Sequence, residues 1–157
     1  MATKVNPIPA GYHTATPYLT LNDCARAIDF YKKAFGAQEV MRMDGPPGKI
    51  GHAEIKIGDS VIMLADEMPG AGNRAPKSLG GSPVGIFLYV NDVDSSYKQA
   101  VDAGAKADMP PADMFWGDRY GIVEDPFGHH WSIAHRLVDL SPAELHAAAA
   151  QAMCQQP

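Results

Sequence analysis

The feature that most constrains the fold is a repeat inside the chain. Residues 19–23 (LTLND) and residues 88–92 (LYVND) are similar strand-like runs that lie about 69 residues apart, and each precedes a stretch with helical spacing of apolar residues. A glycine, Gly36 or Gly104, follows each stretch at the place where a helix commonly ends. Self-similarity at a fixed period indicates a duplicated structural unit. We therefore expect two modules with the same order of elements.

Strands follow each predicted helix. Residues 51–66 (GHAEIKIGDSVIMLAD) have a hairpin pattern that turns at Gly58-Asp59, a pair that is typical of a type I′ turn. Residues 118–135 repeat this pattern around the motif DPFG at 125–128. The order strand, helix, strands is thus predicted twice.

The segments between and after the modules differ in composition. A stretch rich in Gly, Pro, Ser and Asn separates the two modules and is interpreted as a linker or lid loop. A last helix is predicted to begin at Ser141, where Pro142 and Glu144 complete a capping box. The expected boundaries are 12–66 for the first module, 67–83 for the loop, 84–136 for the second module and 137–157 for the C-terminal helix and tail.

Composition excludes several classes of protein. With 157 residues, 46% hydrophobic residues and a net charge of -5, the chain has enough apolar material for a core and is not expected to be disordered. The sequence contains neither an apolar run of about 18 residues nor an apolar leader, so neither a membrane span nor secretion is expected. The two cysteines, Cys24 and Cys154, form no disulfide framework, which predicts a cytoplasmic location. An acidic balance without a Lys/Arg cluster argues against a nucleic-acid partner.

Two motifs resemble those of a known family. Residues 23–36 (DCARAIDFYKKAFG) resemble the first helix of the vicinal oxygen chelate superfamily, which includes glyoxalase I, bleomycin- and fosfomycin-resistance proteins and extradiol dioxygenases. Residues 124–129 (EDPFGH) resemble the Asp-Pro-x-Gly motif in its final hairpin. The motifs occur in the family's order, and the resemblance covers roughly residues 12–136.

Three further stretches are most similar to the PhnB-like branch of that superfamily, whose members mostly lack an assigned reaction. They are residues 52–55 (HAEI), 63–66 (MLAD) and 115–121 (FWGDRYG). The resemblance implies an α+β fold: two βαβββ modules form a cup-shaped mixed sheet with helices on its outer face. A C-terminal helix is added to that fold. The resemblance also implies a homodimer, and the predicted C-terminal helix has no obvious segment of its own chain to pack on.

Members of the superfamily bind a divalent metal through His, Gln or Glu on strands that face the cup. Aligned on the two motifs, the four ligand positions fall on Thr16, Met63, Gly85 and Ser132. A thioether prefers soft metals, glycine has no side chain, and neutral hydroxyls are weak donors. We therefore expect the usual metal site to be absent and no cofactor to be bound. A divalent metal is expected only through a non-standard site.

Strand alternation predicts what lines the cup instead. A two-residue turn at Gly58-Asp59 places Glu54 opposite Met63, and opposite residues project to the same face. His52 and Glu54 then face the cup, because the resemblance places Met63 there. The other predicted ligand-binding residues are Tyr18, Met63, Phe87, Tyr89, Trp116, Arg119, His130 and Ser132.

Each of these residues also has a structural interpretation. His52 and Glu54 are candidate catalytic residues, as an acid–base pair or as two ligands of a displaced metal site, or they form a polar strand face that meets water. Arg119 binds a ligand's carboxylate or phosphate, or forms a salt bridge to Asp118 or Glu124. Trp116 stacks on a ligand or covers the mouth of the cup.

Three hypotheses for function follow. The first is a glyoxalase/bleomycin-resistance-like protein that binds a small amphipathic molecule in a cup without the usual metal. The second is a lyase, isomerase or dioxygenase-type enzyme with a non-standard site around His52 and Glu54. The third is an interaction module with a vestigial pocket. The expected partners are a small-molecule ligand and a second copy of the chain. The sequence leaves open whether a reaction is catalysed.

Overall fold

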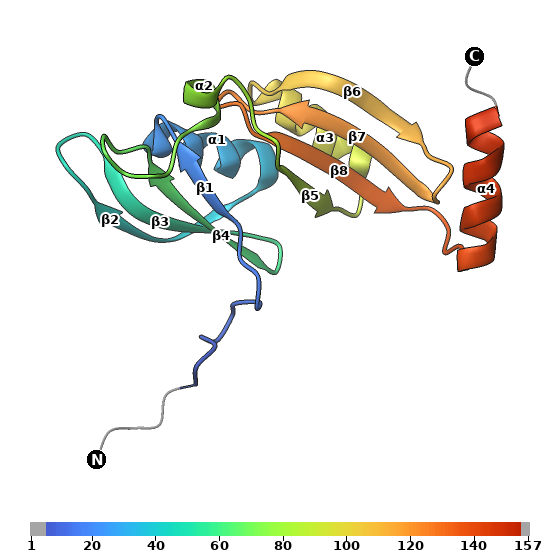
Figure 1. Cartoon of the computed structure of the whole chain (residues 1–157), viewed down its shortest axis with the longest axis horizontal. Coiled ribbons are helices and arrows are strands. Elements are labelled where there is room, and N and C mark those ends of the chain that lie inside the picture. The colour runs from blue at the N-terminus through green and yellow to red at the C-terminus, as the bar shows by residue number, and fades with distance from the viewer. Residues whose placement is uncertain (1–5, 155–157) are drawn as a thin grey trace. The chain divides into compact units, whose positions relative to one another are not determined.

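The computed structural model describes residues 6–154, which form two compact units that divide after Ser82. Figure 1 labels their elements. The first unit contains β1 (Tyr18–Leu21), α1 (Cys24–Phe35), β2 (Gln38–Asp44), β3 (Ile50–Ile57), β4 (Ser60–Asp66) and α2 (Pro76–Leu79). The second contains β5 (Gly85–Tyr89), α3 (Val93–Asp102), β6 (Lys106–Asp113), β7 (Asp118–Glu124), β8 (His130–Arg136) and α4 (Pro142–Cys154).

The two units repeat one topology. The first sheet has the strand order β1-β4-β3-β2 and the second β5-β8-β7-β6, with one parallel pair and two antiparallel pairs in each. Tyr18 pairs with Met63 in the first sheet, and the residues 69 positions later, Phe87 and Ser132, pair in the second. The predicted fold, α+β with two βαβββ modules and a C-terminal helix, is confirmed.

The first helix of each unit is fixed by its ends and by one apolar face. The Asp23 side chain accepts a hydrogen bond from the Arg26 N–H at 3.2 Å and begins α1, and Gly36, at a φ of 66°, ends it. Asp92 caps α3 in the same way through the Ser95 N–H. The buried core of the first unit joins α1 to its sheet and includes Leu21, Cys24, Ala27, Ile28, Tyr31, Ala53, Ile55 and Leu64.

A buried aspartate joins three elements of the first unit. Asp66, at the end of β4, accepts hydrogen bonds from the backbone N–H of Cys24 at 3.0 Å and of Ile50 at 2.7 Å. Its carboxylate therefore fixes the start of α1 and the start of β3 against β4. The side chain is only 3% exposed, and Lys49 lies 3.6 Å from it. This carboxylate stabilises the fold and does not face the candidate site.

A second buried aspartate organises the last hairpin. One carboxylate oxygen of Asp125 accepts from the backbone N–H groups of Phe127 and His129, at 2.8 and 3.0 Å, and the other accepts from the indole N–H of Trp131 at 2.9 Å. The DPFG motif is thus a turn that a buried carboxylate holds from inside. Trp131 is fully buried, so the aspartate also fixes the largest side chain of this core.

The hairpin between β3 and β4 turns where expected, but with a different turn. Ile57 pairs with Ser60, so the loop is Gly58-Asp59. A type I′ turn needs positive φ at both loop residues, whereas only Gly58 has one, at 59°. The predicted type I′ turn is therefore wrong. The predicted loop length and strand register are confirmed. A two-residue loop gives the same strand pairing in a type I′ turn and in the other two-residue turn types.

The C-terminal helix has the predicted start and no buried residue. The Glu144 carboxylate accepts from the Ser141 N–H at 2.8 Å, and the Ser141 hydroxyl accepts from the Glu144 N–H at 3.4 Å, which forms the capping box. None of the residues of α4 is buried. Among residues 6–154, no helix combines the length and the apolar character that crossing a bilayer would require.

Candidate functional site

The candidate site lies on the face of the first sheet opposite α1. Ala53 and Ile55 are fully buried on the helix side of β3, so His52, Glu54 and Lys56 project to the other side. Glu54 pairs with Met63 of β4, as the turn at Gly58-Asp59 predicted. The carboxylate of Glu54 is nevertheless buried, with only 6% of the residue exposed. This face is therefore covered at Glu54 and does not simply meet water.

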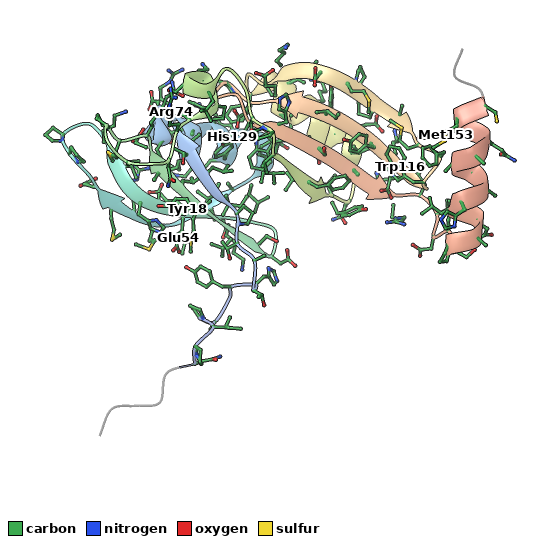
Figure 2. The ribbon with its side chains drawn as sticks, in the orientation of Figure 1. Tyr18, Glu54, Arg74, Trp116, His129 and Met153 are labelled. Atoms are coloured by element: carbon green, nitrogen blue, oxygen red, sulfur yellow. The ribbon has the colours of Figure 1, made fainter. Side chains whose placement is uncertain are left out.

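Four side chains form a hydrogen-bonded chain around this carboxylate. The Tyr12 hydroxyl donates to Oε2 of Glu54, and Nε2 of His52 lies 3.2 Å from Oε1. The Tyr18 hydroxyl lies 3.1 Å from Nδ1 of His52. A neutral His52 with its hydrogen on Nε2 satisfies both contacts, because it donates to Glu54 and accepts from Tyr18. Figure 2 shows Tyr18 and Glu54 on the first sheet.

This chain favours an ionised Glu54. The hydrogen bond from Tyr12, followed by contributions from His52, lowers the pKa of Glu54 against the opposing effect of burial. The same bond raises the pKa of Tyr12. Because folding lowers the pKa of Glu54, these bonds stabilise the fold fully above the pKa of an unfolded glutamate, about 4.3. Their contribution is lost as the pH falls through the lower pKa of the folded state.

The raised pKa of Tyr12 can be measured. In the folded chain, Tyr12 is expected to ionise above about pH 10, the usual value for tyrosine, because its proton is held by a carboxylate. In the Glu54→Gln variant its pKa is expected to return toward that value. Carbon-13 NMR of the tyrosine Cζ carbons follows each phenol, and the Tyr12→Phe variant identifies the signal. The same Tyr12 pKa in wild type and Glu54→Gln would contradict the contact.

A pocket of about 440 Å³ opens beside Glu54. Glu54 and Met63 form its floor on the sheet, and the segment before β1 forms its wall. That wall combines apolar side chains, hydroxyl-bearing side chains and one imidazole: Pro7, Ile8, Pro9, Tyr12, His13, Thr14 and Thr16. The site therefore combines one buried carboxylate with a mainly apolar surround, which is the usual composition of a small-molecule pocket.

Three of the predicted residues of the second unit share one aromatic cluster. The rings of Phe87 and Tyr120 stack with centroids 5.6 Å apart, and Tyr89 and Trp116 contact this pair at 5.0 and 5.6 Å. The Tyr120 hydroxyl bonds to the hydroxyl of Ser132 at 2.9 Å. Phe87 and Tyr89 are 47% and 60% exposed, so this sheet face offers a surface of aromatic rings.

An ion pair lies beside that cluster. Asp118 is 2% exposed, its carboxylate accepts from the Tyr89 hydroxyl at 3.1 Å, and Arg136 lies 2.7 Å from its other oxygen. Arg136 also lies over the Tyr89 ring, 5.9 Å from its centroid. The pair fixes the position of Tyr89. His130, another predicted residue of this unit, pairs with Gly85 at the start of β8.

Arg119 has different partners from those that the sequence suggested. Its guanidinium bonds to both oxygens of Asp94 at 2.9 Å and to Asp113 at 2.8 Å. The alternative of a salt bridge to Asp118 or Glu124 is therefore wrong. Asp113 is the cross-strand neighbour of Arg119, and Asp94 comes from the first turn of α3. Binding of a ligand anion by Arg119 stays a prediction.

The four positions that the resemblance assigns to the family's metal carry side chains that do not suit a divalent cation. The Thr16 hydroxyl donates to the backbone carbonyl of His13 at 3.4 Å, and the Ser132 hydroxyl is bonded to Tyr120. Met63 offers a thioether and Gly85 no side chain, so the set lacks the carboxylate and imidazole donors that such ions prefer. Within residues 6–154, the structure places no three His, Cys, Asp or Glu side chains together as a metal site.

Two site residues are missing from the sequence prediction. Tyr12 donates to Glu54 across 42 positions of sequence, and Tyr120 joins Phe87 and Trp116 in the aromatic cluster. Strand alternation could have indicated Tyr120, because it lies on β7 in register with Ala134 and therefore projects to the same face of the sheet as Ser132. Tyr12 lies in a segment with no strand or helix periodicity, so no local pattern indicates its contact.

Comparisons with known proteins agree with this fold. The uncharacterized protein Mb0911c of Mycobacterium bovis is 44% identical over 151 residues, which cover 94% of this chain and 95% of that protein. The crystal structure of the At5g48480 product of Arabidopsis thaliana superposes with a TM-score of 0.65 at 29% identity, over 78% of this chain and 98% of that one. A Bacillus cereus protein described as PhnB and as a putative 3-demethylubiquinone-9 3-methyltransferase superposes with a TM-score of 0.60 at 16% identity, over 78% of this chain and 99% of that one.

The family model extends over most of the chain. The model of the Glyoxalase/Bleomycin resistance protein/Dioxygenase superfamily matches residues 12–133, which cover the first module and the second as far as the middle of β8. The match begins at Tyr12 and includes His52, Glu54 and the aromatic cluster. The chain therefore belongs to the glyoxalase/bleomycin resistance protein/dioxygenase superfamily.

Proposed function

We propose that this protein is a PhnB-like member of its superfamily that binds a small amphipathic molecule in the pocket beside Glu54. The observation that carries the proposal is the buried Glu54 carboxylate, 6% exposed, at the floor of a pocket of about 440 Å³. Burial of a carboxylate costs free energy unless polar partners compensate, so a carboxylate placed at a pocket floor is typical of a ligand anchor. The apolar wall around it suits the body of an amphipathic ligand.

The proposal includes the loss of the family's metal site. Its support is the donor chemistry of Thr16, Met63, Gly85 and Ser132, which leaves the ligand to be held by hydrogen bonds and apolar contacts. The aromatic cluster and His130 are proposed as ligand-binding residues of the second unit, separate from the pocket beside Glu54. A homodimer and a cytoplasmic location belong to the same proposal, and their support is the family resemblance and the two unpaired cysteines.

A fragment screen by NMR tests the proposal. With the full chain labelled, fragments of about ten non-hydrogen atoms are expected to shift the resonances of Tyr12, Thr16 and Met63 with millimolar affinity, because these residues line the pocket. Residues of α1 on the other side of the sheet serve as the internal control and are expected to stay unchanged. A screen without hits at this pocket would contradict the proposed function and favour an interaction module.

A second candidate function is an enzyme of the lyase, isomerase or dioxygenase type. The hydrogen-bonded chain Tyr18–His52–Glu54–Tyr12 favours it, because a carboxylate oriented by an imidazole and a phenol can take and return a proton. Metal analysis of the purified chain separates the two candidates. Near-stoichiometric Zn, Ni, Mn or Fe would favour the enzyme, and a metal-free chain that retains fragment binding would favour the binding protein.

A further inference from the structure

Within the part of the chain that the structure describes, no lysine or arginine pairs with the charge on Glu54. Among residues 6–154, its ion-pair contact within 4.0 Å is His52, at 3.2 Å from Oε1, and it forms none with a lysine or arginine. Oε2 is satisfied by a neutral phenol, that of Tyr12. The other side chains that line the pocket are apolar or carry a hydroxyl, except for the imidazole of His13. On the side that faces the pocket, the negative charge is therefore held by a neutral donor, and the pocket lining brings it no lysine or arginine.

This arrangement distinguishes between classes of ligand. A ligand carboxylate or phosphate placed at the same position would be repelled by Glu54 and would lack a lysine or arginine of the pocket lining to pair with. An alcohol would replace one neutral donor, the Tyr12 hydroxyl, by another and gain little. A protonated amine would bring a positive charge as well as a hydrogen-bond donor, so it would form an ion pair with Glu54 that a neutral hydroxyl cannot form. Pro7, Ile8 and Met63 would surround its apolar body.

The Tyr12 hydroxyl belongs to a segment that can move away from Glu54. Residues 6–17 lie outside every helix and strand, and most of them are exposed. Within this segment the Tyr12 N–H donates to the Pro9 carbonyl at 3.3 Å and the Thr16 hydroxyl donates to the His13 carbonyl. Only its end is anchored to the sheet by a described backbone bond, from the Met63 N–H to the Pro17 carbonyl at 2.9 Å. Segments with few buried contacts open at low free-energy cost. Movement of Tyr12 therefore requires no unfolding of the sheet.

We infer that the pocket beside Glu54 takes a protonated amine with an apolar body, and that its ammonium group displaces the Tyr12 hydroxyl from Oε2. This inference rests on the proposed function and names the ligand class of the same site. The Tyr12 side chain then moves away from the carboxylate while Pro7 and Ile8 stay in the pocket wall, so the Tyr12–Glu54 hydrogen bond acts as the latch of the site. In the free protein, the Tyr12 hydroxyl occupies the position beside Oε2 that the ammonium group takes in the complex.

Three probes with one carbon skeleton test the ligand class. They are 2-phenylethylamine, 2-phenylethanol and phenylacetate, titrated into the full chain at pH 7 and followed by the NMR shifts of the pocket residues. The amine is expected to bind about tenfold or more tightly than the alcohol, because only the amine pairs a positive charge with the carboxylate. Phenylacetate is expected to bind most weakly. Equal affinity of the amine and the alcohol would overturn the amine assignment and leave the proposed function intact, whereas no binding by any probe would overturn both.

The Tyr12→Phe variant tests the displacement. Removal of the competing hydroxyl is expected to strengthen amine binding several-fold, up to about tenfold, because the ammonium no longer has to break a bond to a charged acceptor. The matched control is Tyr97→Phe, which removes a buried hydroxyl of the second unit that has no hydrogen-bond partner among residues 6–154 and should leave the affinity unchanged. Weaker amine binding in Tyr12→Phe than in wild type would mean that Tyr12 holds the ligand, and would overturn the displacement.

Discussion

Replacement of Asp125 by alanine is expected to lower the free energy of unfolding of the second unit by about 3–4 kcal/mol. The change leaves the backbone N–H groups of Phe127 and His129 and the indole N–H of Trp131 without their acceptor. Asp125 is 3% exposed, so water replaces these bonds poorly. Both tryptophans of the chain, Trp116 and Trp131, belong to the second unit, so tryptophan fluorescence during urea unfolding reports on this unit alone.

The matched control for this experiment is Asp139→Ala. The Asp139 side chain is 96% exposed and lies 3.8 Å from Arg136 in the same unit. Its loss is expected to change the stability by less than about 0.5 kcal/mol. A loss of under about 1 kcal/mol in Asp125→Ala would contradict the view that this carboxylate holds the last hairpin from inside.

Replacement of Glu54 by glutamine is expected to weaken ligand binding about 10- to 100-fold while the first unit keeps its fold. Glutamine has nearly the same shape and keeps an oxygen for one of the two donors, Tyr12 or His52. It removes the charge, which is the part of the site that the proposed ligand recognises. The stability of the first unit, followed by amide hydrogen exchange of β3 and β4, is expected to change by less than about 1 kcal/mol.

The control for this second change is Asp59→Asn. It converts a carboxylate to an amide in the exposed turn between β3 and β4, remote from the pocket lining. Ligand affinity in Asp59→Asn is expected to equal that of wild type. If Glu54→Gln unfolded the first unit instead, Glu54 would be a structural residue, and the pocket would lose the observation on which its proposed function depends.

The fold could be predicted from the sequence because local signals and the repeat agreed. The two-residue loop at Gly58-Asp59 fixed the register that pairs Glu54 with Met63, and the alternation of the strand then placed His52 beside Glu54. The turn type of that loop, in contrast, could not be predicted from the sequence. Two turn types fit the same loop length, and the φ of Asp59 decides between them.

The parts of the site that the sequence did not predict depend on contacts distant in sequence. Tyr12 reaches Glu54 across 42 positions from a segment without regular structure, so neither periodicity nor register indicates the contact. The salt-bridge alternative for Arg119 named Asp118 or Glu124, but Asp118 is its neighbour on the strand, and adjacent strand residues face opposite sides of a sheet. Asp118 instead pairs with Arg136, and Arg119 with Asp94 and Asp113.

The most direct test of the Glu54 pocket as a ligand site is a crystal structure of the full chain grown with 2-phenylethylamine. The account predicts the amine nitrogen within about 3.2 Å of Glu54 Oε2, the phenyl ring against Met63 and Ile8, and the Tyr12 hydroxyl moved away from the carboxylate. A structure in which the amine lies elsewhere while Tyr12 still donates to Glu54 would contradict it.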